Sequence, residues 1–276
     1  MMMEGIDHTT SWTAQITCMK WTISVLFIIW LLLTPQPLSG ARPLVTDDAD
    51  TAGKGKAQIE LGVEIFTWQD RERGIKTRET GTEISSTFTY GVADHLDLVV
   101  GIPYVWGAME KNGQTTFDAD RLSDISLEVK WRFYENKVFQ VAFKPGLTLP
   151  TGNHRKEFGT GRPTYGLVFI ASKEMGDMGF HFNTCYTRNE NKVDKRVNLW
   201  SASVAATYEA IKGLNLVGNV GLKHNTDPAI KTAPAFWLAG FNYSFNDYFT
   251  IDGALKFRLN RQEADRAMIA GITIRF

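Results

Sequence analysis

The sequence predicts an all-β protein, namely a transmembrane antiparallel up-and-down β-barrel of about 12 strands. Three observations predict this fold. Segments of about ten residues that alternate between apolar and polar side chains recur along the chain, as outer-membrane strands do. Short connections alternate with longer ones between these segments. The final segment, Arg266–Phe276, alternates in the same way and ends on an aromatic side chain, like the C-terminal strand by which bacterial barrels are recognised for insertion.

The N-terminal region has the pattern of an export signal. Ile23–Leu33 is a long apolar run, shorter than the roughly 20 residues that span a bilayer, which argues against the alternative of a membrane anchor. Lys20 precedes this run, and small residues up to Ala41 follow it. We therefore expect residues 1–41 to hold a secretory signal peptide that is cleaved near Ala41. The residues before Met19 include acidic but no basic side chains, so we expect translation to start at Met19.

The segment after this signal, residues 42–55, is polar and rich in turn-forming residues. We expect it to be a periplasmic lead-in to a barrel formed by residues 56–276. Cys185 is the one cysteine of the expected mature chain, so no disulfide is expected within it. The 30 basic and 30 acidic residues balance, which implies no nucleic-acid partner. The 5 histidines stand at no metal-ligand spacing, and we expect neither a metal nor a cofactor.

The clearest strand pattern is that of Leu122–Tyr134, where apolar side chains alternate with polar ones such as Asp124, Glu128 and Arg132. The weakest is that of Pro163–Ser172, which is apolar on both faces. In chain order, the predicted strands are Ala57–Trp68, Glu83–Tyr90, His95–Trp106, Leu122–Tyr134, Val138–Pro150, Pro163–Ser172, Met178–Arg188, Val197–Glu209, Leu214–His224, Ala233–Phe245, Tyr248–Leu259 and Arg266–Phe276.

The predicted connections fall into two groups that alternate along the chain. The short turns are Gly91–Asp94, Glu135–Lys137, Met175–Asp177, Ala210–Gly213 and Asn246-Asp247. The longer loops are Gln69–Glu79, Gly107–Arg121, Thr151–Arg162, Asn189–Arg196, Thr226–Thr232 and Asn260–Asp265. Short turns on the periplasmic side and longer loops outside are typical of outer-membrane barrels, and an even number of strands places both mature termini in the periplasm.

The two faces of the predicted strands differ in character. One face carries Ile, Leu, Val and Phe, with aromatic residues near strand ends, and suits a lipid-facing band; a buried core is the alternative. The other face carries charges, which we expect to line the lumen. These pore candidates are Glu60, Glu64, Glu128, Lys130, Arg132, Lys144, His181, Lys223, Asp252, Lys256, Arg258 and Arg275. Opposite charges in such a lumen more often form structural pairs than bind a solute, because an unpaired buried charge is costly.

A family resemblance rests on Phe143–Asn153 (FKPGLTLPTGN), Phe158–Tyr165 (FGTGRPTY) and Ser123–Glu135. These segments resemble the outer-membrane transporter family named for the meta-cleavage pathway of phenol degradation. The resemblance implies a barrel associated with uptake of aromatic or other hydrophobic compounds, and it implies no binding residues. Proline and glycine suit the exit from a strand into a loop. If that loop bends inward it forms a constriction, for which the candidates are Pro150, Gly152, Gly159, Gly161 and Arg162.

The expected function is passage of small, hydrophobic or aromatic solutes through the outer membrane, either along the lumen or by lateral exit through the wall. A closed structural or surface-interaction barrel is one alternative. An outer-membrane enzyme is the other, and it would need a nucleophile near His181. Asn183 shares the face of His181, but no serine lies on that face of the strand, so we expect no catalytic residues and no enzyme.

The expected partners follow from the fold. They are outer-membrane lipid and lipopolysaccharide, the barrel-insertion machinery through the strand that ends at Phe276, and a small-molecule solute. The charged loops Gln69–Glu79 and Asn189–Arg196 offer Arg and Lys to lipopolysaccharide phosphates, although solvated charge is the simpler interpretation.

Overall fold

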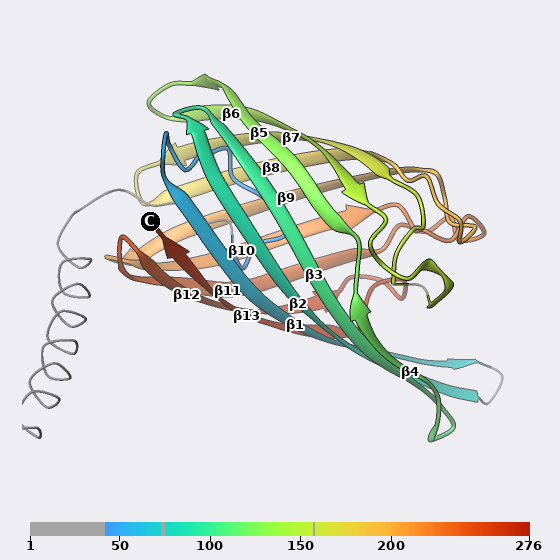
Figure 1. Cartoon of the computed structure of the whole chain (residues 1–276). Coiled ribbons are helices and arrows are strands. Elements are labelled where there is room, and N and C mark those ends of the chain that lie inside the picture. Colours follow the sequence, from blue (N-terminus) through green and yellow to red (C-terminus); the bar gives the residue numbers. More distant parts are fainter. Residues whose placement is uncertain (1–41, 73–74, 157) are drawn as a thin grey trace, which may run out of the picture.

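The computed structural model describes residues 42–72, 75–156 and 158–276, which form a closed antiparallel β-barrel (Figure 1). The strands are β1 (Ala57–Glu72), β2 (Ile75–Ala93), β3 (Leu96–Lys111), β4 (Gln114–Leu122), β5 (Ile125–Glu135), β6 (Phe139–Leu149), β7 (Thr164–Met175), β8 (Met178–Arg188), β9 (Asn198–Ile211), β10 (Leu214–Lys223), β11 (Ala235–Asn246), β12 (Phe249–Arg258) and β13 (Arg266–Arg275). A short 3-10 helix, His154–Lys156, lies between β6 and β7. The expected signal peptide lies outside the described residues.

The barrel closes where β1 pairs with β13, from Gln58 opposite Arg275 to Thr67 opposite Arg266. Ala57 and Phe276 exchange main-chain hydrogen bonds of 3.2 and 2.8 Å at the end of this seam. Closure satisfies the main chain of both terminal strands, which an open sheet in a lipid bilayer would leave unpaired. The strand predicted at Arg266–Phe276 is confirmed as β13. The short turns lie at the same end of the barrel as the C-terminus (Figure 1).

The predicted twelve-strand count is confirmed, because β4 and β5 share one position in the 12-strand ring. β3 pairs with β5 from Leu96 to Gly101 and with β4 from Tyr104 onward. Pro103 lies between these two stretches and has no N–H to give to the ladder. The break between β4 and β5 faces this proline, and the Ser123 N–H donates to the Pro103 carbonyl across it, at 3.0 Å.

Two predicted loops are wrong. Most of the described residues in Gln69–Glu79 and Gly107–Arg121 lie within paired strands. β1 and β2 remain paired as far as Glu72 opposite Ile75, and β3 and β4 as far as Lys111 opposite Gln114. These hairpins project beyond the other connections, at the lower right of Figure 1. A hairpin that extends past the bilayer needs no lipid-facing alternation of apolar side chains, and the sequence has no period-2 signal in these two ranges.

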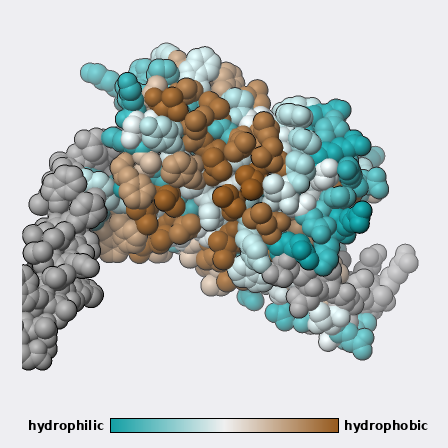
Figure 2. All heavy atoms as spheres, viewed as in Figure 1, coloured by the Kyte–Doolittle hydropathy of each residue, from teal (hydrophilic) through white to brown (hydrophobic). Residues whose placement is uncertain are grey.

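The outer face of the barrel is apolar, as predicted. Trp131, Phe182, Phe241 and Leu255 are 39 to 48% exposed, although they are large and hydrophobic. Figure 2 shows such side chains gathered over the middle of the barrel, with hydrophilic residues at the end that carries the long connections. A continuous apolar surface of this size suits lipid rather than water. The described part of the chain holds no helix that is both long enough and apolar enough to span a bilayer.

Candidate functional site

Residues 42–52, here named the inner segment, lie against the inner wall of the barrel. Residues 42–55 were expected to form a periplasmic lead-in, whereas residues 42–52 contact the inward-facing side chains of the barrel. In chain order the segment contacts β13 and β12, then β11 to β5, and finally β3, all through inward-facing groups. Its polar, turn-rich composition resembles that of a linker. Its location follows from partners far away in the sequence.

The segment begins at Arg42, whose guanidinium lies across four strands. Its Nε donates to Asp252 at 3.2 Å, and one terminal nitrogen lies 3.5 Å from the Ser85 hydroxyl. Between them, Gly62 and Gly271 face each other in the ladder, and a Cβ on either would collide with the guanidinium. The Asp252 side chain is 1% exposed, so Arg42 neutralises an otherwise buried carboxylate.

We expect Gly271→Ala to destabilise the protein by about 1–3 kcal/mol, because the added methyl group displaces the Arg42 guanidinium from the buried Asp252 carboxylate. The measurement is the temperature at which the barrel loses its compact mobility on a denaturing gel. Gly218→Ala is the matched control, since a Cβ on Gly218 meets nothing within 4 Å. Equal transition temperatures for the two variants would contradict the close approach of Arg42.

The middle of the segment is held by Asn219 of β10. The Asn219 side-chain oxygen accepts hydrogen bonds from the main chain of Val45 at 2.8 Å and of Thr46 at 3.1 Å. Its nitrogen donates to the Thr46 hydroxyl at 2.7 Å, and that hydroxyl donates to Ser203 of β9 at 2.8 Å. Just before, Leu44 packs against a buried apolar cluster from β10, β11 and β12. Asn219 and Ser203 were not among the predicted site residues.

Asp47 joins two predicted lumen residues. Its carboxylate accepts hydrogen bonds from Lys144 at 2.8 Å and from Lys130 at 3.1 Å, and Lys130 also contacts Asp48 at 3.4 Å. The two lysine side chains are only 17% and 9% exposed. The Asn183 amide, suitably oriented, bonds the main-chain N–H and carbonyl of Asp47 at 2.7 and 2.9 Å. This is the most charged part of the interface, and it compensates two buried ammonium groups.

The segment ends near the short turns. Asp50 accepts hydrogen bonds from Arg132 at 3.2 Å and from Gln140 at 2.7 Å. The Ala52 N–H donates to Asp97 at 3.0 Å, and Asp97 is 1% exposed. Each part of the inner segment therefore has its own polar partner on the barrel wall, and the segment is seated along its whole length.

Ser172 and His181 form a buried pair beneath the segment. Ser172 Oγ lies 2.9 Å from His181 Nδ1, and the two residues are 2% and 5% exposed. Ser172 was not predicted, because it lies on the neighbouring strand β7 and the pairing register of two strands cannot be inferred from the pattern of one strand. The distance suits a nucleophile and its base. However, the Ala49 N–H also donates to Ser172 Oγ at 2.9 Å, and within the described residues no hydrogen bond orients the other ring nitrogen of His181. The pair forms part of the seat of the inner segment.

The remaining predicted lumen residues lie mostly in pairs. Lys256 donates to Glu64 at 2.5 Å, and Arg275 donates to Gln58 and Thr250, both at 2.9 Å. Other pairs are Glu128 with Lys144 at 3.5 Å, Lys223 with Glu263 at 3.5 Å, and Arg258 with Asp265. Glu60 is half-buried and faces Thr87 and Thr273 in the neighbouring strands. Whether any of these residues contacts a solute stays a prediction.

The predicted constriction loop is folded around Asp124, at the break between β4 and β5. One Asp124 oxygen accepts the Gly152 N–H at 2.9 Å, and the other accepts the N–H and hydroxyl of Thr160 at 2.8 and 2.7 Å. A Cβ on Gly159 would lie 2.5 Å from Asp124, and one on Gly152 would collide with the Phe158 carbonyl. The glycines of this motif therefore allow close packing around a carboxylate that the sequence analysis did not single out.

The other candidates in this loop lie at its ends. Pro150 follows β6 directly and is exposed. Gly161 has a positive φ of 70°, and a Cβ there would lie 2.7 Å from His154. Arg162 is 3.9 Å from Glu190 in the next long connection. That this loop narrows the lumen stays a prediction.

We expect Asp124→Ala to increase the rate of trypsin cleavage after Arg155 and Lys156 about tenfold. The loss of charge-assisted hydrogen bonds makes local opening of the loop easier. Cleavage is followed by mass spectrometry. Glu190→Gln serves as the control, because it removes a carboxylate from a neighbouring exposed pair and leaves Asp124 in place. Unchanged cleavage in Asp124→Ala would show that the loop is held by other contacts.

The family model described as "Putative MetA-pathway of phenol degradation" matches residues 40–276. The chain belongs to this family. An outer membrane channel from Pseudomonas putida F1 is similar to it in structure, with a TM-score of 0.65 and 15% identity over 83% of this chain and 98% of that one. The KdgM porin has a TM-score of 0.52 and 10% identity over 79% and 99% of the two chains.

The NanC porin has a TM-score of 0.50 and 11% identity, and the match covers 78% of this chain and 98% of that one. At such identities these likenesses show the fold, which is that of outer-membrane channels. No curated protein matches the sequence significantly. Fold and family together make the chain an integral outer-membrane barrel protein.

Proposed function

We propose that the protein is an outer-membrane channel for small hydrophobic or aromatic solutes. The observation that carries this proposal is the inner segment. A separate stretch of chain lies in the interior, so its displacement would widen the lumen without breaking a strand. Most of its partners are polar or charged groups, which water can solvate after it leaves, although Leu44 and Ala49 also contact apolar side chains. The family description, with its reference to phenol degradation, supports aromatic compounds as the solutes.

Two routes are open to such a solute, along the lumen or laterally through the wall. The β5–β6 ladder supports the lateral route, because pairing is absent where Val129 and Lys130 face Lys144 and Pro145. An apolar groove of about 380 Å³ lies on the wall beside this gap, lined by Leu96, Val129, Trp131, Phe143, Pro145 and Leu167. A solute that partitions into lipid would meet a weakened seam there.

We further propose the usual orientation of an outer-membrane barrel. The short turns and both mature termini lie in the periplasm, and the long connections lie outside. The C-terminal strand is read by the insertion machinery, and basic residues of the long connections meet lipopolysaccharide. The export signal is the part of residues 1–41 that follows the expected start at Met19, and no catalytic residues are assigned.

The test is single-channel recording of the refolded Arg42–Phe276 protein in planar bilayers. Discrete openings support a channel and justify uptake measurements with phenols, aromatic acids and alkanes. A folded, heat-modifiable but silent barrel would overturn the proposal. It would favour the closed structural barrel, which the many bonds of the inner segment also suit. The alternative of an outer-membrane enzyme predicts a catalytic activity that the His181→Ala variant loses.

A further inference from the structure

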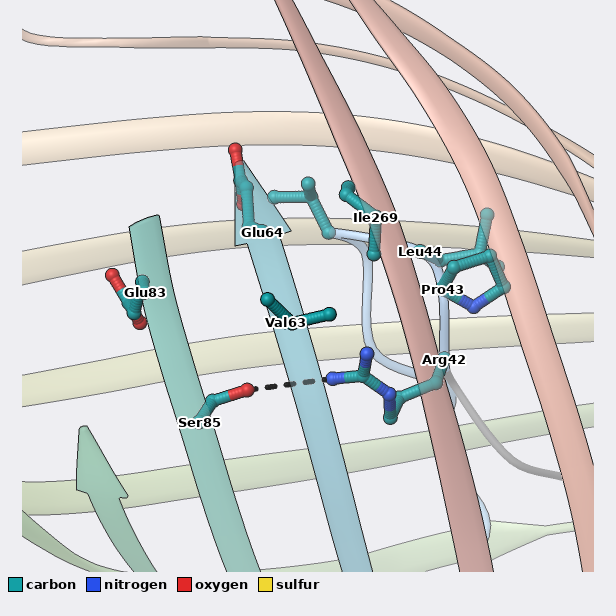
Figure 3. Close-up of a pocket in the computed structure, with 9 residues that line it drawn as sticks. Arg42, Pro43, Leu44, Val63, Glu64, Glu83, Ser85 and Ile269 are labelled. Carbon is teal, nitrogen blue, oxygen red and sulfur yellow. Dashed lines mark hydrogen bonds between the residues drawn. The ribbon is translucent and has the colours of Figure 1, made fainter. Parts of the chain in front are cut away.

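A cavity of about 110 Å³ lies between the start of the inner segment and the inner faces of β1, β2 and β13 (Figure 3). Arg42 and Ser85 bound one side, and the carboxylates of Glu64 and Glu83 lie on another. Glu64 and Glu83 face each other directly across the β1–β2 ladder. The cavity is thus lined partly by the barrel wall and partly by the inner segment, which is bound to that wall by noncovalent contacts.

The charges around this cavity do not cancel. Lys256 neutralises Glu64 through a 2.5 Å hydrogen bond, and Arg42 is paired with Asp252. Glu83 is exposed to the interior, and within the described chain it forms no hydrogen bond or ion pair. The Glu64 and Glu83 carboxylates are opposite each other across two strands and repel each other. The ammonium group of Lys256 is bonded to Glu64 and leaves Glu83 without an ion pair among the described residues. One negative charge with free acceptor oxygens therefore remains at the edge of the cavity.

The rest of the lining is apolar. Pro43, Leu44 and Val45 of the inner segment and Ile269 of β13 supply it. Figure 3 shows Ile269, Leu44 and Pro43 on the side opposite Glu83, with the main chain of β1 between them. An enclosed apolar cavity that holds one benzene molecule has a volume of about 150 Å³. The space here, about 110 Å³, is smaller and only partly enclosed, so a single ring would fill it and extend towards the lumen.

We propose that this cavity is a subsite for small amphiphiles that carry a hydrogen-bond donor and no negative charge, with Glu83 as the acceptor. The apolar part of the ligand contacts Leu44 and Ile269, and its hydroxyl or ammonium group binds the Glu83 carboxylate. Phenols and aryl-alkyl amines fit this description. Aromatic carboxylates do not, because they meet the uncompensated charge. The inference rests on the proposed function only in that it makes the ligand a solute in transit.

The test is calorimetric titration of the detergent-solubilised Arg42–Phe276 protein with phenol, benzylamine and benzoate, each against a protein-free micelle blank. At neutral pH, benzylamine is a cation and benzoate an anion of nearly the same size. We expect benzylamine to bind most tightly, phenol next, and benzoate at least about tenfold more weakly than benzylamine. Equal binding of benzylamine and benzoate would overturn the proposal.

The variant Glu83→Gln keeps the size of the side chain and removes its charge. It should weaken benzylamine binding about tenfold and abolish the discrimination against benzoate. Thr87→Val, on the same strand and face but outside the cavity lining, should change neither. If Glu83→Gln binds all three ligands as the parent protein does, the subsite is refuted. If the protein binds benzylamine selectively but shows no conductance, the subsite is supported and the channel is refuted. If it conducts but does not bind benzylamine selectively, the channel is supported and the subsite is refuted.

Discussion

A disulfide between Cys residues introduced by Thr46→Cys and Ser203→Cys is expected to abolish the conductance of the channel, and reduction is expected to restore it. The two native hydroxyl oxygens are 2.8 Å apart, so the replacing sulfur atoms lie within reach of each other. Cys185→Ser is included so that no other thiol competes. The bond would tie the inner segment to β9 at a fully buried point, since Thr46 is 0% exposed. Recording from one bilayer before and after a reductant is added measures the effect.

The control for the disulfide is a protein with one introduced cysteine, which cannot form the bond. Thr46→Cys alone, with Cys185→Ser, should conduct equally under oxidising and reducing conditions. Equal conductance of the oxidised and reduced double-cysteine protein would contradict gating by the segment and would mean that ions pass beside it. Heat-modifiable mobility on a gel verifies that the barrel is folded in both the oxidised and the reduced state.

The sequence predicted the barrel because its wall obeys a local rule. Outward side chains such as Leu127 and Phe182 meet lipid along the whole strand, so a period of two persists from strand to strand. The closing strand was readable for the same reason. This alternation is required only where a strand crosses the bilayer. The hairpin extensions of β1–β2 and β3–β4 lack it, and they were therefore predicted as loops.

The inner segment left one readable trace on the strands. Ile170 and Leu238 face inward and are 0% and 2% exposed, where a polar lumen would call for hydrophilic residues. Ile170 packs against Ala49, and Leu238 belongs to the cluster that Leu44 meets. The apolar inward face of β7, which made its strand pattern the weakest, thus marks the seat of the segment. Apolar inward residues predict that something covers them, but they do not say which part of the chain does so.

The partners of the segment were not readable, because they are set by long-range register. Arg42 and Asp252 are 210 positions apart, and Asp47 and Lys144 are 97 apart. The charged lumen residues were identified as a class, and pairing among them was the expected interpretation. That several pair with residues 42–52 rather than with one another depends on a chain path that no local pattern records.

Asp47→Ala is expected to release the inner segment from its seat. Removal of one partner from a buried ion pair leaves an uncompensated charge and costs about 3–5 kcal/mol. Lys130 and Lys144 retain weaker contacts with Asp48 at 3.4 Å and Glu128 at 3.5 Å, so the lower end of this range applies. About 3 kcal/mol corresponds to roughly a hundredfold larger unseated population.

The measurement of this release is the rate at which a maleimide labels a cysteine placed at position 46 by Thr46→Cys, in a Cys185→Ser background. Thr46 is fully buried while the segment is seated, so labelling reports its departure and should be about a hundredfold faster with Asp47→Ala. Asp50→Asn is the matched control. Asp50 is 38% exposed and Arg132 keeps other partners, so an effect below about fivefold is expected. If the two variants label equally fast, the segment is held by the sum of its small contacts, and the two lysines find compensation without it. A fast Asp47→Ala together with a slow Asp50→Asn would instead identify the Asp47 bridge as the contact whose loss opens the barrel.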